Sequence, residues 1–81
     1  KNFKLFPNPT NGVTFINITN TENTNINVMV MDINGRIVSQ RDYDINGSVQ
    51  LPIVTNDLDK GIYIVRLTVG DSVQQQKLIV Q

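Results

Sequence analysis

The residue composition restricts the fold of this chain more than any single motif does. The 81 residues include no alanine, the strongest helix former, whereas Ile, Val and Thr make up a third of the sequence. Branching at Cβ restricts the χ1 angle against a preceding helical turn, but such side chains pack well on a pleated sheet. We therefore expect an all-β chain.

Turn-forming dipeptides divide the sequence into short segments with the alternating pattern of strands. In the clearest segment, Tyr63, Val65 and Leu67 share one face and are expected to point inward. Two sheets packed face to face let many short strands bury one side each, so we predict an immunoglobulin-like β-sandwich of about seven antiparallel strands, with a small partly open barrel as the alternative. The expected strands are residues 4–6, 12–19, 26–33, 36–43, 48–53, 62–69 and 72–80.

Glycine and proline positions predict how these strands begin and end. Asn34-Gly35 and Gly70-Asp71 are expected to be hairpin turns, the first of type I′ with a positive φ at both residues. Pro52 has no N–H to donate, so its strand is expected to lie at a sheet edge or to end there. Pro7 and Pro9 restrict their own φ and that of the preceding residue. The segment around them is therefore expected to be stiff and extended.

The missing residue types argue against an enzyme. The chain has no His, Cys or Trp, which removes the commonest general base, the thiolate nucleophile and the usual transition-metal ligands. We expect no catalytic residues and no cofactor. Seven basic and seven acidic side chains cancel without forming blocks, so nucleic acid is not an expected partner. No apolar run approaches the ~20 residues of a membrane helix, so no direct membrane span is expected.

The stretch Asp42–Gly47 has the D-x-D-x-N-G start of a calcium-binding loop. Asp42, Asp44 and Asn46 would supply the oxygen ligands that calcium prefers. Such a loop needs a bidentate carboxylate at its twelfth position, where this chain has Ile53. We therefore favour a turn between two strands over a metal site.

Four ordered motifs resemble one known family. They are "FPNPTNG", "MDINGRIV", "LDKGIYIVRL" and "QKLIVQ", and together they extend over essentially the whole chain. This combination resembles the type A C-terminal sorting domain of type IX secretion system cargo in the Bacteroidota. The matching positions are Pro7, Asn8, Pro9, Gly12, Asp32, Gly35, Arg36, Gly61, Tyr63, Lys77, Leu78 and Val80.

The resemblance implies a non-catalytic secretion signal, with residues 1–81 forming one domain at the C-terminus of a larger secreted protein. Its implied partners are the type IX translocon, an outer-membrane β-barrel shuttle protein and a sortase-like protease that joins the cargo to a surface lipopolysaccharide. The implied route runs through the periplasm to the cell surface. Two features depart from the family: Leu5-Phe6 replaces a frequent tyrosine, and the last strand has fewer lysines than usual.

The last strand is the expected site of recognition. A terminal strand with little charge and a free edge can be bound by strand addition or threaded into the mouth of a barrel. We expect Gly61–Gln81 to form the recognition surface, with Gly61, Tyr63, Leu78 and Val80 contributing and Lys77 as a polar anchor. The other matching positions would form a stiff joint to the cargo and support the fold. Free strand edges also favour a weak homodimer.

Two other functions remain open from the sequence. A carbohydrate-binding module would present exposed aromatic side chains on a flat face, but the chain has only five aromatic residues, most of which the core is expected to need. A structural immunoglobulin-like spacer would require the polypeptide to continue past Gln81. For Tyr63 and Lys77 the non-functional alternatives are a core tyrosine with a hydrogen-bonded hydroxyl and a charge that discourages edge pairing.

Overall fold

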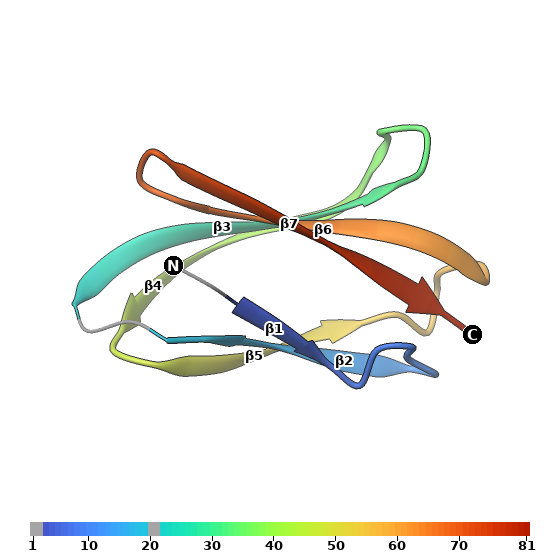
Figure 1. Cartoon of the computed structure of the whole chain (residues 1–81), viewed down its shortest axis with the longest axis horizontal. Coiled ribbons are helices and arrows are strands. Elements are labelled where there is room, and N and C mark those ends of the chain that lie inside the picture. Colours follow the sequence, from blue (N-terminus) through green and yellow to red (C-terminus); the bar gives the residue numbers. More distant parts are fainter. Residues whose placement is uncertain (1–2, 20–21) are drawn as a thin grey trace.

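A computed structural model describes residues 3–19 and 22–81, and it confirms the immunoglobulin-like sandwich of antiparallel strands (Figure 1). The three-stranded sheet has the order β1-β2-β5 and the four-stranded sheet the order β4-β3-β6-β7. No helix of the described ranges is long and apolar enough to cross a membrane. The strands are β1 (Phe3–Phe6), β2 (Val13–Ile18), β3 (Asn23–Asp32), β4 (Ile37–Asn46), β5 (Val49–Val54), β6 (Gly61–Val69) and β7 (Ser72–Val80).

The core lies between the two sheets and follows the alternation of the sequence. In β6, Tyr63, Val65 and Leu67 are all buried, as expected. Alternate residues of a strand point to opposite faces, so each strand contributes every second side chain to this layer. The other buried members of the core are Phe3, Ile16, Ile18, Ile26, Val28, Val30, Ile45, Ile53, Leu78 and Val80.

The β3–β4 turn differs from the expected type I′. Gly35 has a φ of 86°, but no other residue type in the described chain has a positive φ, so Asn34 does not fit that turn. The central residues are Ile33 and Asn34, because the N–H of Gly35 donates to the carbonyl of Asp32 at 3.0 Å. The Asp32 carboxylate also accepts from the N–H groups of Asn34 and Arg36, each at 2.9 Å. The Asp32 side chain therefore favours a turn with Ile33 and Asn34 at its centre, followed by Gly35 in the left-handed backbone conformation.

The stretch Asp42–Gly47 does not form the turn that we expected. Strand β4 continues through Asn46, the residue before Gly47. The carboxylate of Asp42 accepts a hydrogen bond from the Asn27 amide at 2.8 Å, and that of Asp44 accepts one from Asn25 at 3.0 Å. These bonds join β4 to β3 across the sheet, so residues with turn propensity lie within a strand. Within the described ranges no group of three or more acidic side chains is placed to hold a metal ion.

The edge strands meet in pairs at the two sides of the sandwich. β1 and β7 meet at one side, where the Gln76 side-chain amide donates to the carbonyl of Phe3. β4 and β5 are the edges at the other side. The position of β5 confirms the prediction from Pro52, which lies within this edge strand. Each side therefore has two strands with a backbone edge that no further strand of its sheet covers.

The aromatic side chains divide between the core and one outer face. Phe3 and Tyr63 are buried, and the half-buried Tyr43 packs against the core. Phe6 is 69% exposed and pairs with the half-buried Phe15 on the outer face of the three-stranded sheet. Three of the five aromatics therefore contribute to the core, as the sequence predicts.

Candidate recognition site at the C-terminal strand

The last strand, β7, is the outermost strand of the four-stranded sheet. The two-residue loop Gly70-Asp71 joins it to β6, and Val69 pairs with Ser72 next to that loop. Gly70 has a φ of 59°, as the first central position of a type II′ turn requires. Backbone groups alternate in direction along an antiparallel strand. Those of Ser72, Gln74, Gln76, Leu78 and Val80 bond to β6, whereas those of Val73, Gln75, Lys77 and Ile79 face the outer edge.

Half of this outer edge is covered by the proline-rich segment, which we call the terminal clamp (residues 7–10). The side chain of Asn8 donates to the carbonyl of Lys77 at 2.8 Å and accepts from the N–H of Ile79 at 3.0 Å. Thr10 continues the pairing, because its N–H donates to the carbonyl of Ile79 at 2.8 Å and its carbonyl accepts from the N–H of Gln81 at 2.8 Å. The clamp thus acts as a short extra strand on β7.

Buried threonines hold the terminal clamp in place. The hydroxyl of Thr10 donates to the carbonyl of Val13 at 2.8 Å, and that of Thr14 donates to the carbonyl of Pro7 at 2.7 Å. Both threonines are almost fully buried. The peptide bonds before Pro7 and Pro9 are both cis, and the segment bends onto β7. The expectation of an extended segment was therefore wrong, because residues 7–9 bend and only Thr10 pairs with β7 through its backbone.

The five residues expected to be recognised lie together but differ in exposure. Leu78 pairs with Tyr63, and Val80 pairs with Gly61, so β6 and β7 bring them side by side. Leu78, Val80 and Tyr63 are buried, and only Gly61 and Lys77 are exposed. The Tyr63 hydroxyl donates to the carbonyl of Asp59 at 2.7 Å. Tyr63 is therefore a core tyrosine with a hydrogen-bonded hydroxyl, as its non-functional alternative predicts.

The four sequence motifs converge on the same end of the sandwich. Asp32 pairs with Tyr63 across β3 and β6, Tyr63 pairs with Leu78 across β6 and β7, and Thr10 bridges to Val80. Residues from four places in the sequence therefore lie in two neighbouring rows, Asp32–Tyr63–Leu78 and Gly61–Val80–Thr10. We call these two rows, Lys77 beside them and the terminal clamp the motif end.

Gly35 and Arg36 belong to the turn that leaves the motif end. Arg36 Nε lies 3.2 Å from Asp32 Oδ2, in an ion pair whose arginine side chain is 80% exposed. The backbone N–H of Arg36, which donates to the carboxylate, lowers the pKa of Asp32 below its ordinary value, and the N–H of Asn34 and the guanidinium act in the same direction. Asp32 is therefore a structural carboxylate that organises the turn.

Lys77 is a charged side chain of the motif end. It is exposed, and no described carboxylate forms a salt bridge with it. Toward the end of β7 its neighbours on the outer face are apolar: Lys77 pairs with Ile64, and Ile62, which is 46% exposed, pairs with Ile79. A cation beside a small apolar surface can bind a partner that carries a carboxylate next to apolar side chains.

Sequence reasoning missed Thr10, Thr14 and Gln76. The two threonines are the buried donors that fix the clamp, and Gln76 joins β7 to β1. Thr14 follows the alternation of β2 and was detectable as an inward position. No signal in the sequence marks Thr10 or Gln76, because the backbone of Thr10 and the side chain of Gln76 each pair with residues about seventy positions away.

The structure defines a small β-sandwich module whose sequence motifs gather at one end of the sandwich. The model of one family, described as the secretion system C-terminal sorting domain, matches residues 4–81. The chain belongs to this family, the type IX sorting domains that the four motifs indicated. The comparison with curated proteins found no match.

Proposed function

We propose that this domain directs an attached cargo across the outer membrane by presenting its motif end to the type IX machinery. The family is a sorting signal, so a cargo that carries it is secreted or placed on the cell surface, and the signal interacts with secretion components. The translocon and an outer-membrane β-barrel shuttle protein are the proposed readers. A sortase-like protease would then release the domain, residues 1–81, from a larger protein and attach the cargo to the surface.

The convergence of the four motifs on the motif end, next to β7, is the observation that carries this proposal. Lys77 and Gly61 are exposed there, and the outward backbone groups of Val73 and Gln75 lie beyond the clamp. A partner can therefore contact the lysine, the neighbouring apolar side chains and the uncovered strand edge. Leu78 and Val80 are buried, so in the folded domain they support the strand and do not touch a partner.

An export assay separates recognition from folding. The domain is fused to a reporter in a type IX-competent bacterium, and the exported fraction is compared for Lys77→Gln and Lys4→Gln. Both lysines are exposed on strands, but Lys4 lies on β1 of the other sheet. We expect Lys77→Gln to reduce export several-fold and Lys4→Gln to leave it unchanged, with unchanged thermal unfolding in both. Equal export of the two variants would exclude Lys77 as the anchor.

Deletion of Leu78–Gln81 is a less specific test. It removes two core side chains and the strand residues that the clamp binds, so it is expected to unfold the domain. Lost export after this deletion would not identify a contact. Export that persisted after it would reject the whole proposal, because neither the fold nor the last strand would then be needed.

A further inference from the structure

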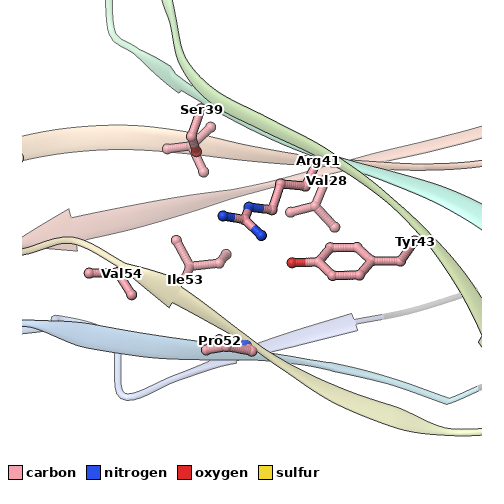
Figure 2. Close-up of a pocket in the computed structure, with 8 residues that line it drawn as sticks. Val28, Ser39, Arg41, Tyr43, Pro52, Ile53 and Val54 are labelled. Carbon is pink, nitrogen blue, oxygen red and sulfur yellow. The ribbon is translucent and has the colours of Figure 1, made fainter.

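A groove opens between β4 and β5, at the opposite edge of the four-stranded sheet from β7 (Figure 2). Its volume is about 270 Å³, which is room for one or two side chains. The floor is apolar and consists of the core residues Val28, Val30 and Ile53. The β4 wall is polar and consists of Ser39, Arg41 and Tyr43.

The strand register explains why polar groups face the core here. Arg41 pairs with Val28 and Ser39 pairs with Val30, so these β4 side chains share the core-facing side of the sheet. Figure 2 shows the Arg41 guanidinium and the Tyr43 hydroxyl extending into the space between the sheets, toward β5. A cation thus lies over an apolar floor.

The charge of Arg41 has no counterpart in the described chain. No carboxylate of residues 3–19 and 22–81 forms a salt bridge with it. The β5 wall of the groove consists of Pro52 and Val54, which carry no charge, beside Ile53 of the floor. The neighbouring Asp42 accepts a hydrogen bond from Asn27 on the outer face of the sheet. The groove therefore favours an anionic occupant.

The backbone of β4 indicates that this occupant is a polypeptide. In β3, Asn27, Met29 and Met31 bond to β6, which leaves alternate residues to bond Ser39, Arg41 and Tyr43 of β4. The backbone groups of Gln40 and Asp42 consequently face the free edge along the groove. An extended chain can hydrogen-bond to these groups while its alternate side chains enter the groove.

We propose that the β4–β5 groove binds an extended acidic peptide segment of a partner protein. The segment adds to the free edge of β4, and an inward Glu or Asp side chain accepts hydrogen bonds from the Arg41 guanidinium and the Tyr43 hydroxyl. Apolar residues two positions to either side cover the groove floor. This surface is separate from the motif end, so the domain has a second docking site.

Amide chemical shifts of the labelled domain test this proposal with defined peptides. The probe is acetyl-Val-Thr-Glu-Thr-Val-amide, and its control has Gln in place of Glu. We expect shifts at Ser39–Tyr43 and at Ile53-Val54, with binding of the Gln peptide weaker by about tenfold, as the loss of a charge-assisted hydrogen bond predicts. Equal binding of the two peptides, or no shifts at these residues, would overturn the proposal.

Two arginine variants and a small acid complete the test. Arg41→Gln is expected to weaken binding of the Glu peptide by about tenfold. Arg66→Gln is expected to leave binding unchanged, since Arg66 bonds to Gln75 on the outer face of the sheet. Hexanoate supplies the carboxylate without a peptide backbone and should bind more weakly than the Glu peptide. Equal affinity for hexanoate would reject the peptide as occupant, and binding unaffected by Arg41→Gln would reject the site.

Discussion

The side chain of Asn8 accepts a hydrogen bond from the backbone N–H of Ile79, 71 positions later in the sequence, at 3.0 Å. The same side chain donates to the carbonyl of Lys77 at 2.8 Å. One asparagine amide therefore occupies a donor and an acceptor of the β7 edge, as a neighbouring strand would. This relationship makes the proline-rich segment and the C-terminal strand a single structural unit.

Replacing Asn8 should loosen the end of β7. Asn8→Ala removes both hydrogen bonds, and each such bond contributes about 1 kcal/mol net, so we expect destabilisation by roughly 1–2 kcal/mol. Urea unfolding measures the total effect, and hydrogen exchange at the amide of Ile79 should become faster. Asn11→Ala is the matched control, because Asn11 directly follows the clamp, is exposed and has no side-chain hydrogen bond to the described residues. Equal stability of the two variants would contradict the role of the clamp.

Two buried threonines provide an opposed pair of predictions. The Thr14 hydroxyl donates to the carbonyl of Pro7 at 2.7 Å, whereas the Thr55 hydroxyl is buried without a hydrogen-bond partner in the described chain. Thr14→Val should therefore destabilise the domain by about 1 kcal/mol, while Thr55→Val should be neutral or stabilising. Thermal unfolding of the two variants checks this. The same loss of stability in both would show that the hydroxyl of Thr14 contributes nothing.

The Asp32 turn predicts how stability depends on pH. Hydrogen bonding from the Arg36 N–H lowers the pKa of Asp32 in the folded state, so ionised Asp32 stabilises the fold above its unfolded pKa of about 4. This contribution is lost as the pH falls through the lower folded pKa. Melting temperatures of wild type and Asp32→Asn should differ near pH 7 and converge toward pH 2. A difference in melting temperature that persists at pH 2 would show that the ionisation of Asp32 is not its cause.

The alternation of apolar residues predicted correctly which strand residues are buried. The predictions of turns and strand ends failed where side-chain hydrogen bonds determine the local structure. Val65 and Leu67 were placed correctly because each strand has one buried face. The Asn34-Gly35 turn was wrong because the preceding Asp32 carboxylate organises a different turn. The predicted end of β4 at Tyr43 was wrong. Asp44 is a common turn residue, but here its carboxylate accepts a hydrogen bond from Asn25 across the sheet, and the strand continues.

The candidate site was predicted only in part. The motifs indicated the correct family, and Lys77, which they marked, is exposed on the last strand. Recognition by that strand stays a prediction. Their residue types do not show that Leu78 and Val80 are buried rather than presented. The contact of Asn8 with β7 was not predictable, because one side chain makes it across nearly the whole length of the chain.

The part of the β7 edge that the clamp leaves uncovered predicts weak self-association. The backbone groups of Val73 and Gln75 face outward there, so a second copy can add its own β7 antiparallel to the first. Sedimentation should show a concentration-dependent homodimer at high protein concentration. Gln75→Pro removes an outward N–H while leaving the ladder to β6 intact, since a proline is tolerated where its nitrogen faces solvent. We expect this variant to remain folded and monomeric.

Gln74→Pro is the matched control for this edge. The backbone N–H of Gln74 faces Leu67 of β6, so the same substitution one position earlier breaks a ladder hydrogen bond and should cost the domain stability. A dimer that survives Gln75→Pro would place the self-association elsewhere, for example at the free edge of β4. If Gln75→Pro also reduces export of a reporter while Lys77 is intact, the uncovered edge is part of what the secretion machinery binds, and strand addition is then the means of recognition.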